Sequence, residues 1–421
     1  MTDSESLFNK LKSMGVTLGQ KPAQPADPAP AESSGNGRIL GQGIEAVISG
    51  FDHPTPYGPA FLYQEQYGAD YAHGRIPLCL ERDMQVLAAW GGTPGICQKD
   101  CQNVVFLDTE TSGLQGGTGT YAFLVGIGYR TPTGFELVQF FMRDPGQEPA
   151  LLAALDEWLS RFNVVVTFNG KIFDLPLLNT RYTINGLTAP FSSFEHLDVL
   201  HIARKLWRDR LPSRALGELE KEIVQFNRTG EDIPGWLIPQ LYFDYLRSGD
   251  ARPLGGIFYH NARDILSLAA LYGRIAEMLN DPLGDTVDYG MDLAAIARLY
   301  EEKGWIEQAA ALYERCLETG DMPEPFFFKT MERFALLRRR KGEWELAAQL
   351  WQKAAEHGEI SSCIEIAKYY EHRVRDNAQA LTWARRALEI LDDMRYYIPG
   401  RAALEKDIQR RISRLMSRLE Y

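Results

Sequence analysis

The chain has 421 residues, 45% of them hydrophobic and 24% charged, which is typical of a globular protein of two or three domains. It has neither a run of about 18 apolar residues nor a secretory signal at its N-terminus, so we expect no association with a membrane. Five cysteines, an odd number, argue against a disulfide framework and for a reducing cytoplasm. The net charge of −11 is compatible with phosphate chemistry, because carboxylates that bind divalent metals contribute to it.

The first hundred residues contain few regular patterns. Residues 1–38 are predicted to be an N-terminal segment followed by a flexible linker, because 20–38 is rich in Pro, Ala, Ser and Gly. Residues 39–100 are rich in Gly and aromatic residues, and we interpret them as an irregular region of strands and loops packed on the next domain. Cys97 and Cys101 have no second Cys or His pair nearby, which argues against a zinc site.

Residues 101–283 have the pattern of an α/β domain. Three apolar stretches, NVVFLDTE, YAFLVGIGYR and GFELVQFFM, predict consecutive strands. After them, helical patterns such as EPALLAALDEWLSRF alternate with a further strand, VVVTFNG. This order predicts a mixed sheet flanked by helices.

Residues 290–421 are helical in pattern and contain an internal repeat. Residues 297–318 align with 335–356, so that Gly304 matches Gly342 and Ala309 matches Ala347. A third, weaker copy begins at Ala367. Small residues where paired helices cross resemble the tetratricopeptide pattern, which predicts an all-α repeat domain that binds a protein partner.

The first candidate functional residues lie at the end of a predicted strand. Asp108 and Glu110 are two residues apart in FLDTET, so on a strand both carboxylates point to the same face. Two such carboxylates repel each other unless a proton or a cation lies between them, and oxygen ligands suit Mg or Mn. The alternative is a pair of solvated turn residues.

Two further acids follow in the same region. Asp174 comes shortly after the strand VVVTFNG, where it is also well placed to cap a helix. Asp264 lies early in a predicted helix, and His260 precedes it by one turn, so the two side chains can share a face.

Together, the motifs D-x-E, N-G-x-x-F-D and H-N-x-x-D resemble those of the DEDD superfamily of 3′–5′ exonucleases on the ribonuclease-H-like fold. More narrowly, the chain resembles the YprB-type ribonuclease-H-like domain over roughly residues 45–280. The stretches FLDTETSGL, TFNGKIFDLPLL, EDIPGW and YHNARDILSL carry the resemblance. The order of the three motifs is specific, whereas each motif alone is not.

The resemblance implies cleavage of phosphodiester bonds with two divalent metal ions, Mg or Mn. It makes Asp108, Glu110, Asp174 and Asp264 the metal ligands. A fifth residue would orient or deprotonate the attacking water. One subclass has His five residues before the last Asp, and another has Tyr four before it. Here the identities are exchanged, and we favour His260 over Tyr259 because its pKa is normally closer to neutral.

Other residues near the motifs are candidates for contact with nucleic acid. Thr109, Thr111 and Asn169 are predicted to bind the substrate. Asp198, between the second and third motifs, is interpreted as a helix cap. The basic stretch 204–214 includes Trp207 and is the best candidate for a surface that grips a single strand.

The leading hypothesis is therefore a cytoplasmic, metal-dependent 3′–5′ exonuclease acting on single-stranded DNA or RNA. The alternative is a catalytically idle protein that binds nucleic acid or recruits partners through its helical repeats. A structure-selective endonuclease on the same fold is a third hypothesis. Retention of four acids favours an active nuclease, because an idle site has no need to gather like charges.

Overall fold

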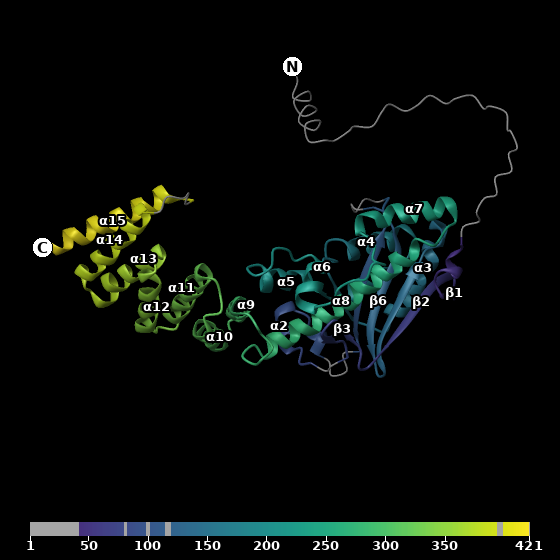
Figure 1. Ribbon diagram of the computed structural model, residues 1–421, viewed down its shortest axis with the longest axis horizontal. Helices are drawn as coiled ribbons and strands as arrows, with labels where there is room; N and C mark the ends of the chain where they lie inside the picture. Colours follow the sequence, from purple (N-terminus) through teal and green to yellow (C-terminus); the bar gives the residue numbers. More distant parts are fainter. Residues whose placement is uncertain (1–41, 80–81, 98–101, 114–118, 394–398, 421) are drawn as a thin grey trace, which may run out of the picture. The chain divides into compact units, whose positions relative to one another are not determined.

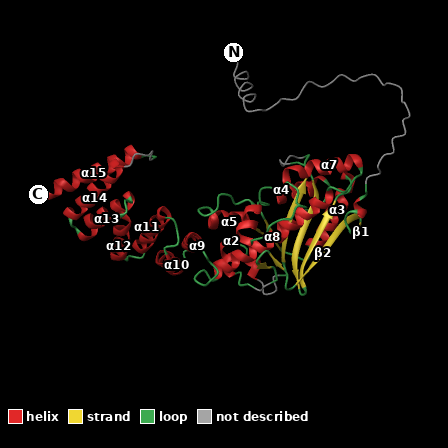
Figure 2. Cartoon of the chain, viewed as in Figure 1, coloured by secondary structure: helices red, strands yellow, loops and turns green. Residues whose placement is uncertain are grey.

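A computed structural model describes residues 42–420 except 80–81, 98–101, 114–118 and 394–398. The expectations for residues 1–38 and for Cys101 lie outside these described residues. Figure 2 shows that the strands belong to the N-terminal part of the described chain and that only helices follow α8.

The central sheet of the described residues has seven strands in the order β1-β2-β7-β6-β5-β8-β9. β5 is parallel to β8 and β8 to β9, and the other neighbours are antiparallel. The mixed sheet predicted from the sequence is therefore present. Its strands are β1 (Phe51–Thr55), β2 (Gly58–Gly68), β5 (Val104–Thr111), β6 (Ala122–Thr131), β7 (Gly134–Phe141), β8 (Val164–Thr167) and β9 (Glu195–Asp198).

The region 39–100 is more regular than its sequence suggested. β1 and β2 extend the same sheet, because β2 pairs along its length with β7. A small separate hairpin, β3 (Ala72–His73) with β4 (Ile76–Pro77), and a helix, α2 (Gln85–Gly91), follow. Two of the strands expected to pack on the next domain are thus part of its sheet.

Both faces of the sheet are covered, and alternate residues of β5 show how. Val104 and Phe106 belong to the apolar core that includes α2, α5 and most of α8, whereas Val105 and Leu107 belong to the core with α3, α4 and α7. Because side chains alternate along a strand, Asp108 and Glu110 continue the first set and face α8. These helices are α3 (Glu148–Leu159), α4 (Asp174–Ile184), α5 (Val199–Trp207), α7 (Ile238–Ser248) and α8 (Leu254–Asn280), with the short α6 (Leu216–Leu219) and a π-helical turn (Glu220–Val224) between α5 and α7.

α8 packs closely on the sheet because β6 has glycines beneath it (Figure 1). A Cβ atom added to Gly126 would lie 2.1 Å from Asn261 Oδ1 and 2.3 Å from Ile265 Cδ1. Both atoms belong to α8. Because Gly126 has no side chain, α8, which carries the third motif, can approach β6 closely. β6 is the neighbour of β5, and β5 carries the first motif.

The described residues after 289 form helices joined by short turns, as the sequence predicted. Gly304 and Gly342, the matched glycines of the repeat, both have positive φ, at 77° and 84°, just before the second helix of a pair. Assignment to the tetratricopeptide class stays a prediction. The helices are α9 (Gly290–Glu302), α10 (Ile306–Thr319), α11 (Glu324–Arg340), α12 (Trp344–Glu356), α13 (Ile360–Tyr369), α14 (Asn377–Asp393) and α15 (Arg401–Leu419).

The basic stretch 204–214 does not form the stacking surface that its sequence suggested. Trp207 is fully buried in the core shared with α8 and α9. Arg210 pairs with Asp292 of α9 at 2.9 Å, and Lys205 pairs with Glu302. The expectation of an exposed Trp207 was wrong, because the apolar face of α5 packs against α9. Binding of a strand by the basic side chains of this stretch stays a prediction.

Replacing Gly126 with Val should lower the free energy of unfolding by about 1–3 kcal/mol, because the added methyl groups overlap Asn261 and Ile265. Urea unfolding measures this loss. Gly217→Ala is the matched control, since a Cβ there meets nothing within 4 Å. Equal stability of the two variants would contradict the close approach of α8 to β6.

Candidate active site

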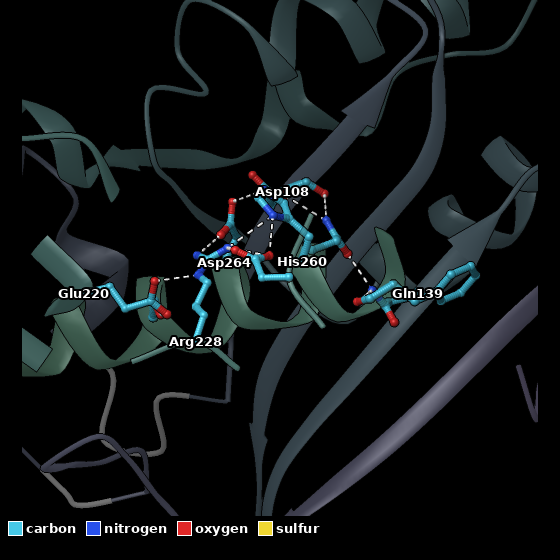
Figure 3. Close-up of polar contacts among 10 residues, drawn as sticks. Asp108, Gln139, Glu220, Arg228, His260 and Asp264 are labelled. Atoms are coloured by element: carbon cyan, nitrogen blue, oxygen red, sulfur yellow. Dashed lines mark hydrogen bonds and ion pairs between the residues drawn. The ribbon is translucent and has the colours of Figure 1, made fainter. Parts of the chain in front are cut away.

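The centre of the site is a row of three residues across three strands. Asp108 of β5 lies opposite Gly126 of β6, and Gly126 lies opposite Gln139 of β7. Asn261 of α8 lies over the glycine and joins Asp108 to Gln139. Figure 3 shows Asp108 and Gln139 on either side of this link. Its Oδ1 accepts from Gln139 Nε2 at 2.8 Å, and its Nδ2 donates to Asp108 Oδ2 at 2.8 Å. The buried Gln139 thus fixes the amide orientation that orders the Asp108 carboxylate.

The last acidic motif reaches the same place from α8. Asp264 follows Asn261 by one helical turn, and its Oδ2 lies 3.7 Å from Nε2 of His260. A guanidinium nitrogen of Arg228 donates to Asp264 Oδ1. Figure 3 shows Arg228 between Glu220 and Asp264. One carboxylate of the group therefore already has a cation beside it.

Asp174 belongs to the first turn of α4, which begins after the turn that follows β8. Its side chain is buried, and its Oδ1 accepts a hydrogen bond from Thr109 Oγ1 at 2.5 Å. Thr109 lies between Asp108 and Glu110 in β5. The first two motifs are therefore tied together directly.

Burial raises the pKa of all four carboxyls, and the charges of the other acids add to the shift for Asp108 and Glu110. Burial, together with the charges of Asp264, Glu110 and Asp174, raises the pKa of Asp108 well above its usual value. Burial and the charges of Asp264 and Asp174 do the same for the pKa of Glu110. Burial raises the pKa of Asp174 to about 6 despite the hydrogen bond from Thr109. Burial also raises the pKa of Asp264, although His260 and Arg228 oppose the shift.

These acids are close but do not form a ready-made metal centre. Among the residues that the structure describes, no three His, Cys, Asp or Glu side chains are grouped as metal ligands. Instead, N–H and O–H donors occupy Asp108, Asp174 and Asp264, and no described side chain donates to Glu110. A desolvated set of oxygen donors that repel one another is nevertheless the chemistry that suits a hard divalent cation.

Comparison with known proteins agrees with this arrangement. A model of the RNase H superfamily matches residues 105–276, the segment that holds all four acids. "Uncharacterized protein YprB" of Bacillus subtilis (strain 168) is 32% identical to this chain over 297 residues, which are 68% of this chain and 69% of the Bacillus protein. The chain belongs to the YprB family. Its fold is that of nucleic-acid-processing hydrolases of the RNase H superfamily, which usually use divalent metals.

Among solved structures, the family B DNA polymerase from Pyrobaculum calidifontis matches with a TM-score of 0.30 and 16% identity. The match covers 48% of the YprB-family chain and 29% of the polymerase. No helix among the described residues is both long and apolar enough to span a bilayer.

His260 and Tyr259, the two candidates for the fifth residue of this YprB-family site, have different contacts. His260 faces the acids, with Nδ1 2.8 Å from Asp232 Oδ1 and Nε2 toward Asp264. The Tyr259 hydroxyl instead accepts from the backbone N–H of Thr229 at 3.2 Å, and its ring contacts Arg263. The geometry favours His260, whose role stays a prediction.

The predicted substrate contacts have structural partners of their own. Asn169 has a left-handed backbone with φ of 67°, and its N–H donates to Asp198 Oδ1 at 2.8 Å. Asp198 also caps α5 by accepting from the N–H of Leu200, which confirms its interpretation as a cap. Thr111 Oγ1 donates to the Gly113 carbonyl at 2.8 Å, next to an irregularity in β5. Binding of substrate by Thr109, Thr111 and Asn169 remains untested.

Sequence reasoning missed four polar residues that organise this YprB-family site: Gln139, Arg228, Asp232 and Asn261. Asn261 had a signal, because it directly follows His260 in the motif. Asp232 lies within EDIPGW, a stretch that carried the family resemblance. Arg228 and Gln139 had none, since a single Arg in a loop and a single Gln in a strand are ordinary surface residues by pattern alone.

Without divalent metal, Asp108→Asn should raise the thermal unfolding midpoint of this YprB-family protein at pH 8 by about 2–4 °C. A carboxyl whose pKa is raised binds its proton more tightly in the folded than in the unfolded chain. The wild type therefore loses stability as pH rises above the ordinary carboxyl range, and the amide removes that loss.

Calorimetry in EDTA at pH 4 and pH 8 measures the effect, which should be small at pH 4, where the carboxyl is protonated in the folded state. Asp407→Asn, at an exposed surface carboxyl, is the control. A lower midpoint for Asp108→Asn at pH 8 would show that the acids do not destabilise one another.

Proposed function

We propose that this protein is a metal-dependent nuclease that hydrolyses phosphodiester bonds, acting as a 3′–5′ exonuclease on single-stranded DNA or RNA. The observation that carries the proposal is the convergence of Asp108, Glu110, Asp174 and Asp264. These acids come from three separate motifs, and two of them have their pKa raised by charges from the other motifs. Gathering like charges costs stability, which is common for groups retained for function.

Asp108, Glu110, Asp174 and Asp264 are the residues that would hold two divalent ions, Mg or Mn. Such ions activate water and stabilise the negative charge that develops on phosphate and leaving oxygens. The chain contributes the fixed orientation of its ligands. Asn261, held by Gln139, orders Asp108, and Thr109 orders Asp174.

His260 is proposed to accept the proton of the attacking water. Its Nδ1 lies 2.8 Å from Asp232 Oδ1 and 3.3 Å from a nitrogen of Arg228. One nitrogen cannot both donate to a carboxylate and accept from a guanidinium, and the shorter contact is the donation to Asp232. The neutral ring then carries its proton on Nδ1, leaving the Nε2 lone pair beside Asp264 free to act as a base.

Large apolar side chains exposed near the acids support a single-stranded substrate. Ile172 and Phe173 directly precede Asp174 and are 61% and 51% exposed. Trp236 is 69% exposed and follows Gly235, whose added Cβ would lie 4.0 Å from His260 Nε2. Exposed aromatic side chains next to a cleavage site provide stacking surfaces for unpaired bases.

The C-terminal helices are proposed to bind a protein partner, as expected of tetratricopeptide-like repeats. A cytoplasmic location, expected from the cysteine content, is part of the same proposal.

The decisive variant is Asp108→Asn, which should reduce Mn-dependent cleavage to background because it removes a proposed metal ligand. The measurement uses end-labelled single- and double-stranded DNA and RNA, with Mn or with EDTA. Circular single strands separate the proposed exonuclease from an endonuclease. Cleavage by the wild type in EDTA, or cleavage by Asp108→Asn at the wild-type rate, would refute the metal-dependent mechanism. Cleavage of circular strands would refute the exonuclease assignment.

His260→Ala should slow cleavage by about 10²–10⁴-fold, whereas Tyr259→Phe should have little effect. The reason is that His260 faces Asp264, while the Tyr259 hydroxyl contacts the backbone at Thr229. Single-turnover rates at saturating substrate compare the two variants. The reverse ranking would transfer the role of the fifth residue to Tyr259.

A further inference from the structure

Arg228 is a nearly buried arginine whose tip reaches the candidate active site. It lies in the loop between the π-helical turn (Glu220–Val224) and α7, and its side chain is 15% exposed. Nε donates to Glu220 Oε2 at 2.7 Å, and Nη2 donates to Asp264. Nη1 lies 3.4 Å from Asp232 Oδ1, a weak contact. Several of its five N–H groups are therefore not used in strong bonds.

The Nε group of Arg228 is held by a buried series of hydrogen bonds through Glu220, Ser267 and His73. Glu220, 2% exposed, accepts from Ser267 Oγ at 2.8 Å, and Ser267 Oγ lies 2.8 Å from His73 Nε2. Because Ser267 gives its only proton to Glu220, the neighbouring His73 nitrogen must be the donor. His73 is fully buried and stacks on Phe226, two residues before Arg228.

The charges of the residues in this hydrogen-bond series help to keep Arg228 in place. Burial alone would raise the pKa of Glu220, but His73 and Arg228 more than offset it, so this pKa lies below its usual value. Burial lowers the pKa of His73, which keeps the ring neutral. Glu220 therefore carries a negative charge and Arg228 a positive one, and the guanidinium of Arg228 lies on the side of the four acids.

We infer that Arg228 is the phosphate-binding residue of this site, and that Glu220, Ser267 and His73 position it. The ligand class is the phosphodiester at the 3′ end of a single strand. The inference rests on the proposed function and deepens it.

Three features argue for phosphate binding rather than for a purely structural ion pair. A guanidinium presents paired donors that match two phosphate oxygens. Four acids would otherwise repel an anionic substrate, and Arg228 is the described cation that bonds directly to one of them. A structural pair would also be complete with Glu220 alone, whereas this side chain extends past Glu220 to Asp264.

The test is a double-mutant cycle between Arg228 and the phosphate charge. A short single strand of DNA is compared with the same strand bearing a neutral methylphosphonate at its 3′-terminal linkage, by fluorescence anisotropy in EDTA. The wild-type, full-length protein should bind the charged strand about tenfold more tightly or better. Arg228→Gln should bind both strands equally, and Arg228→Lys should show an intermediate preference.

Arg263→Gln is the matched control, because Arg263 is adjacent to Asp264 in sequence but donates to Tyr67 and lies over the Tyr259 ring. It should retain the wild-type preference. A strand with the methylphosphonate at its 5′ end should bind like the unmodified one. Equal wild-type affinity for the two 3′ strands, including no measurable binding of either, would overturn the inference, as would a full preference in Arg228→Gln.

The positioning role of Glu220 and Ser267 is tested by the same ratio of affinities for the charged and the neutral strand. A loss of stability alone does not change this ratio. Glu220→Gln and Ser267→Ala should each reduce the preference for the charged strand while thermal unfolding shows a folded protein. If Glu220→Gln does not fold, Ser267→Ala provides the result. If a folded variant keeps the wild-type preference for the charged strand, the buried hydrogen bonds have only a structural role.

Failure of this inference can be distinguished from failure of the proposed function. A wild type that prefers the charged strand but cleaves none in Mn refutes the nuclease and leaves Arg228 as a binding residue. A wild type that cleaves, with a strand preference that survives in Arg228→Gln, refutes only the role of Arg228.

Discussion

The burial of four neighbouring carboxyls, two of which have their pKa raised by the charges of the others, is the constraint on which this structure depends. β5 brings Asp108 and Glu110 to the face that α8 covers, and α8 brings Asp264 to meet them. Each acid withdrawn from water beside the others carries a raised pKa. The fold holds them there through the packing of two apolar cores, one on each face of the sheet.

The protein offsets this repulsion with fixed donors. Asn261 can reach Asp108 only because residue 126 is a glycine, and its amide is correctly oriented only because Gln139 donates to it. Arg228 supplies one positive charge to Asp264 and is itself fixed by buried Glu220. Glu110 receives no donor from the described side chains, which leaves it the most available carboxylate for a cation.

Much of this arrangement could be predicted from local patterns. The strand VVFL followed by Asp108 and Glu110 indicated both the sheet and the direction of the acids, because alternation along a strand is a local property. The order of the three motifs indicated the family. By contrast, β1 and β2 joining the same sheet depends on long-range pairing with β7, which no local pattern in 39–100 reveals. Trp207 was misassigned for the same reason, since only the packing of α9 on α5 shows that its ring is buried.

If these four acids hold divalent cations, the full chain binds Mn²⁺ at them, and the bound ions can be counted. Electron paramagnetic resonance titration of the full chain at neutral pH gives the number of sites. We expect two bound ions per chain in the wild type and a loss of binding in Glu110→Gln. A wild type that binds no Mn²⁺ at millimolar concentration, or a Glu110→Gln variant that binds as many ions as the wild type, would contradict it.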